Sequence, residues 1–179
     1  MADVFCDEEV DEYTQKDCGI DNAGIVALAF IDQNAYSAEP TNENLEDPAW
    51  WEALLAASPK EVHIATKTRG ESQGGTPTEE EGFGKAIIQI TGANRELPAE
   101  FEGLEENRGF VEGVNRRKWR LAFVTSGGKL GYVHTPVRAF FSEKIAKSTT
   151  SGAFWGGSVK WQDYSNPRFV TAPDGIFDE

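Results

Sequence analysis

The chain has 179 residues, 39% of them hydrophobic, and its 30 acidic against 17 basic side chains give a formal net charge of −13 at pH 7. This length and apolar fraction fit a single domain with one core, and no apolar run approaches the roughly 18 residues that span a bilayer. Specific nucleic-acid binding is disfavoured because phosphate contacts need clustered lysine and arginine. The first residues lack the basic and apolar regions of a secretory signal, so synthesis in a cytoplasm is expected.

Residues 1–22 are polar and acidic and are expected to form an acidic N-terminal arm, with residues 23–179 as a single β-rich assembly domain. Cys6 and Cys18 both lie in this arm, and two reduced thiols are the simplest interpretation. A small disulfide loop stays open as an alternative if the protein ends up outside a cell, as virions do. The carboxylates match no EF-hand spacing and no CxxC pair is present, so neither a metal site nor a cofactor is expected.

The first expected strand covers residues 25–31, a continuous apolar run bounded by Gly24 and Asp32. An unbroken run of this kind indicates a buried strand. Residues 33–46 follow it and are rich in Asn, Glu, Ser and Pro, a composition typical of a loop.

Residues 47–57 predict the clearest helix of the chain. Asp47 can cap it, and Pro48 stands at the first helical position, where its missing N–H costs nothing. Trp50 and Trp51 meet leucines at helical spacing, which favours a helix packed on a sheet. An interface anchor built from the two tryptophans is the alternative.

Two strands are expected on either side of a long polar stretch. Residues 61–67 alternate with a period of two, and residues 83–91 carry an apolar centre. We expect these strands to pair as a hairpin whose loop, residues 68–82, is rich in Gly, Glu and Thr. Loops of this length in a compact domain are usually functional or disordered.

The C-terminal half predicts one more helix and several more strands. They are a helix over residues 105–115, a hairpin of strands 118–125 and 129–134 around Ser126-Gly127-Gly128, strands over 138–147 and 153–162, and an extended, turn-rich end over 167–179. Many short strands separated by turns, together with one or two helices, predict a mainly β fold. It would be a β-sandwich or barrel with one or two flanking helices and a long hairpin loop.

Charge is distributed in blocks along this domain. Residues 71–112 hold ten acidic against three basic side chains, and residues 116–147 hold eight basic against one acidic. Solvated surfaces that keep the protein soluble are one interpretation. The sharper hypothesis is that the blocks form complementary faces of opposite charge, which suits head-to-tail stacking of identical subunits.

Catalytic signatures are missing from the sequence. The two histidines, His63 and His134, each lie inside a predicted strand, where a packed or surface role is the usual one. There is no HExxH, GxSxG, P-loop or Rossmann glycine pattern, and the carboxylates cluster in polar stretches instead of the apolar surroundings that acid–base catalysis needs. The chain is therefore expected not to be an enzyme.

Five stretches of the C-terminal half carry a resemblance to a known group of proteins. They are GFGK at 82–85, ENRGF at 106–110, WRLAFVTSGGKL at 119–130, VKW at 159–161 and APDGIFD at 172–178. Together they resemble virion proteins of tailed bacteriophages that infect Bacteroides-type hosts, including crAss-like phages. More broadly, the layout is similar to the tail-tube superfamily, whose members have a β-sandwich, a flanking helix and a long hairpin loop.

The resemblance implies a subunit that closes with copies of itself into rings, which stack with other virion proteins above and below. Subunits would pair at sheet edges, and an acidic lumen would let DNA pass without specific binding. The expected location is the virion tail or neck, with host cytoplasm before assembly and no membrane. The residues expected at self-assembly interfaces are Thr68, Arg69, Glu71, Glu79, Glu80, Glu81, Arg116, Arg117, Lys118, Trp50 and Trp51.

Three alternatives stay open. Within virions, the chain could be a neck connector ring, a capsid-decorating protein or a tail-fibre adaptor. From another class, it could be a β-sandwich module that binds a carbohydrate or peptide on a tryptophan platform, formed by Trp50, Trp51, Trp119, Trp155 and Trp161. A small hydrolase is the third alternative, disfavoured by the shortage of bases.

Overall fold

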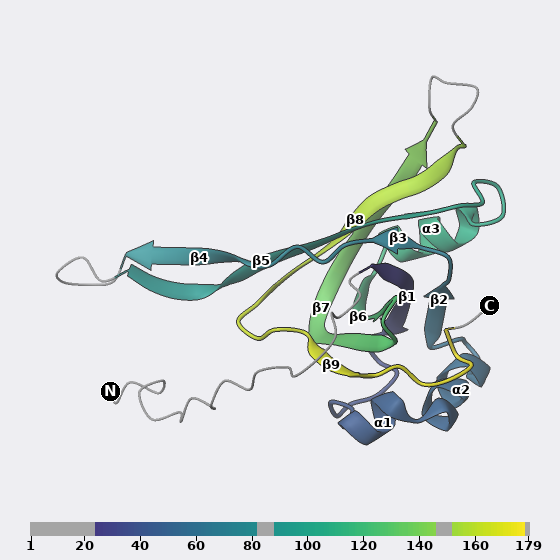
Figure 1. Cartoon of the computed structure of the whole chain (residues 1–179), viewed down its shortest axis with the longest axis horizontal. Coiled ribbons are helices and arrows are strands. Elements are labelled where there is room, and N and C mark those ends of the chain that lie inside the picture. Colours follow the sequence, from purple (N-terminus) through teal and green to yellow (C-terminus); the bar gives the residue numbers. More distant parts are fainter. Residues whose placement is uncertain (1–23, 82–87, 146–151, 178–179) are drawn as a thin grey trace.

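The chain is mainly β-structure, as its short, turn-separated strand patterns predict. The computed structural model describes residues 24–81, 88–145 and 152–177 (Figure 1). Its elements are β1 (Ile25–Asp32), α1 (Asn42–Glu46), α2 (Pro48–Ala56), β2 (Val62–Ala65), β3 (Arg69–Gly70), β4 (Thr76–Glu81), β5 (Ile88–Phe101), α3 (Arg108–Asn115), β6 (Lys118–Thr125), β7 (Lys129–Lys144), β8 (Phe154–Asp163) and β9 (Arg168–Thr171).

Six of the strands close on themselves as an antiparallel barrel. The order around the barrel is β1, β6, β7, β8, β5, β3 and back to β1, with every neighbouring pair antiparallel. The remaining strands add to its outside: β2 pairs with β1, β9 with β7, and β4 with the start of β5. Closure removes the free edges that an open sheet would expose.

The barrel wall has a core on each side where the helices cover it. Along β1, Leu28 and Phe30 point into the barrel, while Ala27, Ala29 and Ile31 pack outward against the helical layer. Alternate side chains of a strand point to opposite faces, so burial of both faces explains why this strand is one unbroken apolar run. The prediction of a buried strand is confirmed, with Val26 as its one exposed residue.

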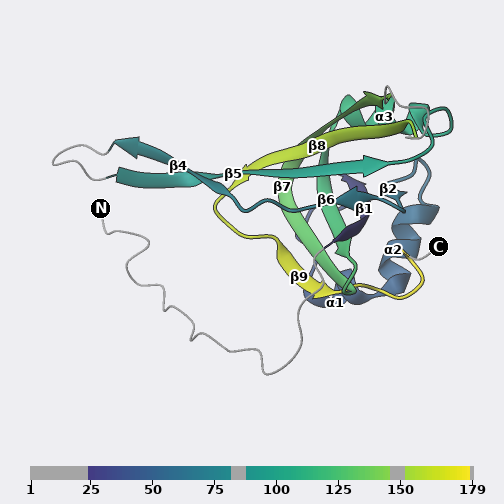
Figure 2. The same ribbon diagram turned by 45° about the horizontal axis from the view of Figure 1, so that its top comes forward.

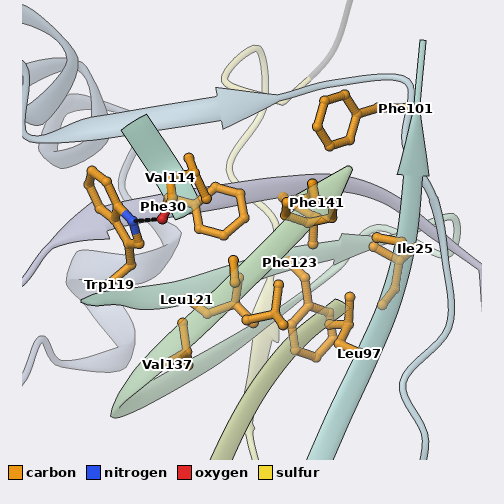
Figure 3. Packing of buried hydrophobic residues seen from close by; sticks show 14 of the residues in the cluster. Ile25, Phe30, Leu97, Phe101, Val114, Trp119, Leu121, Phe123, Val137 and Phe141 are labelled. Carbon is orange, nitrogen blue, oxygen red and sulfur yellow. Dashed lines mark hydrogen bonds between the residues drawn. The ribbon is translucent and has the colours of Figure 1, made fainter. Parts of the chain in front are cut away.

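Aromatic side chains fill the barrel interior, as Figure 3 shows. The ring of Phe30 makes edge contacts with Phe110, Trp119 and Phe141, with centroids 6.0–6.3 Å apart. The Trp119 indole donates its hydrogen bond to the Val114 carbonyl at 3.0 Å, so the polar atom of this buried ring is satisfied. Such edge-to-face packing fixes the interior in one arrangement.

The helix over 48–56 forms as the sequence predicts. The Asp47 carboxylate accepts a hydrogen bond from the Ala49 amide at 2.9 Å, and Pro48 occupies the first turn. Trp51 is fully buried in the outer core, where its indole donates to the Leu45 carbonyl at 2.9 Å. Helix α2 therefore covers one face of the barrel wall.

Helix α3 lies against the barrel and is fastened to β7. Val111 and Val114 enter the inner core. The Asn115 side-chain amide donates a hydrogen bond to the Phe141 backbone carbonyl and accepts one from the Phe141 backbone N–H, both at 2.8 Å. The helix predicted over 105–115 is thus confirmed, although it begins at Arg108, and Asn107 makes no side-chain cap.

The predicted pairing of residues 61–67 with 83–91 is wrong. Strand β2 pairs with β1, and the long polar stretch between the two predicted strands contains β3 and β4. The partner of β5 is β4, whose sequence TPTEEE lacks the apolar alternation by which strands were predicted. The part of the predicted second strand before Ile88 lies outside the described residues.

Other element predictions hold with changes at the boundaries. The hairpin of β6 and β7 forms around residues 126–128 as expected, and the strand predicted over 138–147 is the continuation of the same long β7. The loop expected over 33–46 contains α1, whose capping box between Thr41 and Asn44 was not recognised. The C-terminal stretch adds the short strand β9.

Candidate functional site: a projecting hairpin and a cationic row

The most prominent feature outside the barrel is a two-stranded ribbon, here called the projecting hairpin, made of β4 and residues 88–92 of β5. Figures 1 and 2 show it running away from the rest of the molecule. Strand β8 joins β5 only from Ala93 onward, so residues 88–92 have β4 as their one partner strand among the described residues. Both outer edges of the ribbon are therefore unpaired in the described part of the chain.

The projecting hairpin carries features that control pairing at an edge. Pro77 lies in β4 and cannot donate a backbone hydrogen bond, and acidic residues follow it at 79–81. The register shifts between Thr78 and Glu79, opposite Gly92, which has the positive φ of 155° that glycine tolerates best. Glu79 is exposed. Such an edge resists indiscriminate pairing and favours a partner of matching register and positive charge.

A second feature is a row of three cations on the outer wall of the barrel, here called the cationic row. The strand register places Lys118 of β6 opposite Arg138 of β7, and Arg138 opposite Lys160 of β8. All three side chains are exposed. Directly opposed residues on one face lie about 4.5–5.5 Å apart at Cβ, and like charges at that spacing destabilise a sheet.

The row continues into one acidic residue. Lys160 forms an ion pair with Glu96 of β5 at 3.3 Å, and Glu96 is its cross-strand partner. The Ser158 hydroxyl and Lys160 hold the pKa of the Glu96 carboxyl below its usual value. Within the described residues, Lys118 and Arg138 make no ion pair, so two of the three cations lack an acidic neighbour.

A shallow groove of about 310 Å³ runs along the cationic row. Arg116 and Arg117 lie at its side, and the Phe140 ring, 69% exposed, lies at its edge. An exposed phenylalanine beside basic side chains gives the groove an apolar and a cationic part. This combination suits a ligand that carries both carboxylates and apolar side chains.

Only part of the predicted charge complementarity between blocks remains available to a neighbour. Glu112 pairs with Arg108 at 3.1 Å and with Arg116 at 3.9 Å inside α3 and its end. Arg117 reaches Asp32 at 4.0 Å. Of these three ion pairs, only the one between Glu112 and Arg116 joins the acidic block 71–112 to the basic block 116–147.

The other residues predicted at interfaces lie apart from one another. Arg69 is exposed on β3 and lines a surface hollow of about 490 Å³ with Lys67 and Glu100. Thr68 is only 5% exposed, and its amide donates to the Val26 carbonyl at 2.9 Å. Glu71 is exposed near the root of the projecting hairpin, and the side chains of Glu80 and Glu81 lie outside the described residues.

The tryptophan platform of the carbohydrate-binding alternative does not form. Four of its five members are buried, with exposed fractions of 0–8%: Trp51, Trp119, Trp155 and Trp161. Trp50 is half-buried against Tyr36, with ring centroids 5.5 Å apart. The helix therefore packs on the sheet, and Trp51 belongs to the chain's own core instead of an interface.

A partly buried polar cluster joins the 33–41 stretch to the barrel. The Tyr36 and Tyr132 hydroxyls lie 2.7 Å apart, and the Tyr132 hydroxyl lies 3.1 Å from His134 Nδ1. Burial raises the pKa of both phenols, so neither supplies a base at neutral pH. Arg120 stacks over the Tyr36 ring at 4.4 Å and donates to its carbonyl at 3.0 Å. These contacts hold the 33–41 stretch against β6 and β7.

Sequence reasoning missed Arg138, Lys160 and Phe140, which complete the groove around the predicted Lys118. None of the three stands out in the sequence around it. The register of β6, β7 and β8 brings them together. The sequence signal for Arg138 and Phe140 is the alternation in this strand: Val137, Ala139 and Phe141 point inward, which places Arg138 and Phe140 on the outer face.

Comparison with family models, curated proteins and solved structures finds no match to this chain. In the described residues, no group of three or more His, Cys, Asp or Glu side chains is placed to hold a metal ion. Cys6 and Cys18 lie outside those residues. None of the described helices has the length and apolarity needed to cross a membrane.

Proposed function

We propose that this chain is a structural subunit of a tailed-bacteriophage virion that assembles with copies of itself into a tail-tube or neck ring through which DNA passes. The observation that carries the proposal is the projecting hairpin. A two-stranded ribbon without further partners is marginally stable in water, and here it extends from a closed barrel with both outer edges unpaired among the described residues. A neighbouring copy would complete it.

Strand addition is the mechanism by which neighbours would bind. Main-chain hydrogen bonds to an open edge supply affinity, and side chains on the alternating faces supply register. The barrel itself is closed, and the edges available for pairing in the described chain include those of β2, β4, β9 and residues 88–92 of β5. The projecting hairpin of one subunit would pair with such an edge on the next, which makes a heterologous contact that closes into a ring.

The charge of the chain supports a role around DNA that needs no specific binding. A net charge of −13 repels phosphates, so a lumen lined by such subunits would let a genome slide without sticking. Other virion proteins would contact the ring above and below. The subunit would await assembly in the host cytoplasm.

The test removes the projecting hairpin while keeping the barrel. Replacing residues 78–92 by Asn-Gly joins Pro77 to Ala93, which are cross-strand partners, through a two-residue hairpin turn. We expect the natural chain to form rings in negative-stain images across a concentration and salt series, and the shortened chain to stay monomeric with an unchanged melting temperature.

A control variant keeps the hairpin and neutralises one exposed acid, Glu79→Gln, and should still form rings. Rings of unchanged symmetry from the shortened chain would contradict the proposal. So would a natural chain that stays monomeric under every condition of the series.

A further inference from the structure

The cationic row is energetically unfavourable as the barrel stands. Lys118, Arg138 and Lys160 face one another across three neighbouring strands, and only Lys160 has an acidic partner among the described residues. Opposed like charges weaken a sheet, and the barrel wall has no structural need for cations at exposed positions. Their presence points to an anionic ligand on this face.

The acidic N-terminal arm has the chemistry that fits the groove. Residues 1–22 carry eight acidic side chains and one basic side chain, Lys16. Apolar residues are interspersed among these acids, at Val4, Phe5, Val10 and Tyr13. The groove offers cations together with the exposed Phe140 ring, so both kinds of side chain in the arm would find a counterpart.

We propose that the acidic N-terminal arm of the chain binds the cationic row of the same chain, along the groove beside Phe140. The contact neutralises the opposed cations and covers the exposed ring. This site is separate from the projecting hairpin, and the proposal does not depend on ring assembly.

The length of the arm permits this contact within one chain. The described chain begins at Gly24, whose carbonyl accepts from the Ser126 amide at 2.7 Å at the far end of β6 from Lys118. The eight residues of β6 span about 26 Å at ~3.3 Å per residue. The 23 residues before Gly24 reach as far as about 75 Å when extended, which is ample.

Other anions fit the groove less well. The projecting hairpin of a neighbour offers the acids of β4, three in a row, against eight in the arm. DNA would have to approach a molecule with a net charge of −13. The arm is also covalently attached, so its effective concentration at the groove is about millimolar.

The experiment places a photo-reactive group in the groove of the full chain. Phe140→p-benzoylphenylalanine keeps an aromatic ring at this exposed position. After illumination, mass spectrometry should find cross-links to residues 1–22. An equal mixture of unlabelled and nitrogen-15-labelled chains should give cross-linked peptides within single chains and no mixed pairs. In about 1 M salt, where the screening length falls to ~3 Å, most of the cross-link should be lost.

Two sets of variants test the charge argument. Neutralising the arm, with Glu8→Gln, Glu9→Gln, Asp11→Asn and Glu12→Gln, leaves the barrel untouched and should remove most of the cross-link. Lys118→Glu with Arg138→Glu should do the same.

A matched pair, Lys60→Glu with Lys144→Glu, reverses two exposed cations outside the groove and should leave the cross-link intact. Cross-links to another part of the chain, or between two chains, would overturn the proposal. So would a cross-link to the arm that does not depend on either set of charges. Loss of the cross-link on addition of duplex DNA, without loss in high salt, would also overturn it.

Discussion

The barrel and the projecting hairpin share strand β5 but differ in the number of strands that pair with it. From Ala93 onward, β5 lies between β4 or β3 and β8 and sends Leu97 and Phe101 into the core. Before Ala93, β4 is the one strand that pairs with it among the described residues. The first part is held by burial in the core, and the second is joined to β4 by cross-strand pairing. Within the described chain, the projecting hairpin therefore differs from the barrel in leaving an outer edge of each of its strands unpaired.

The largest expected difference between the two regions is the effect of truncating a side chain. Phe30→Ala removes a fully buried ring that touches three other aromatic rings, and we expect a loss of about 3–5 kcal/mol in the free energy of unfolding. Glu79→Ala on the projecting hairpin should change it by less than about 0.5 kcal/mol. Urea unfolding of both variants measures this, and equal losses would mean that the hairpin is part of the cooperative core.

Because the barrel is closely packed, adding a single methyl group at Gly131 should also lower the free energy of unfolding. A Cβ at Gly131 would overlap the ring of Phe123, so Gly131→Ala should lose about 1–3 kcal/mol through displacement of that ring. The matched control is Gly109→Ala in α3, where a Cβ meets no atom within 4 Å. There, alanine should stabilise the helix by up to about 1 kcal/mol. Thermal melts that rank the two variants the other way would refute the packing argument.

The smallest effect expected is a dependence of stability on pH at the end of β8. Partial burial raises the pKa of the Asp163 carboxyl, but hydrogen bonds from Thr135 and Ser165 outweigh it and hold the pKa below its ordinary value. A depressed folded pKa means that Asp163 stabilises the fold above its unfolded pKa, and that this contribution is lost as pH falls through the folded pKa.

Asp163→Asn should therefore flatten the decline in unfolding free energy between about pH 5 and pH 2. The measurement is urea unfolding at a series of pH values, with Asp174→Asn, an exposed carboxylate, as the control. Identical slopes for the natural chain and Asp163→Asn would show that the hydrogen bonds do not select the charged form.

Local patterns in the sequence predicted the parts of the fold whose causes are local. The apolar run of β1, the Asp47–Pro48 start of α2 and the glycine turn between β6 and β7 were each recognised because neighbouring residues determine them. The mainly β class and the barrel alternative follow from the number and spacing of such strands.

The missed parts depend on which strands become neighbours. Nothing in TPTEEE marks it as the partner of β5, since a solvated ribbon needs no apolar alternation. Lys118, Arg138 and Lys160 lie about 20 positions apart in sequence and meet only through the register of β6, β7 and β8. Pairing and register are tertiary properties, so Lys118 was among the predicted site residues, whereas its cross-strand neighbours Arg138 and Lys160 were not.

Hydrogen–deuterium exchange at residue resolution tests most directly whether the projecting hairpin is the assembly element. In the monomer, amides of residues 76–81 and 88–92 should exchange quickly, while those of β1 and β6 stay protected by the barrel. On assembly, the hairpin amides should become protected and the barrel amides should not change. Assembled rings whose hairpin amides still exchange as fast as in the monomer would contradict the account.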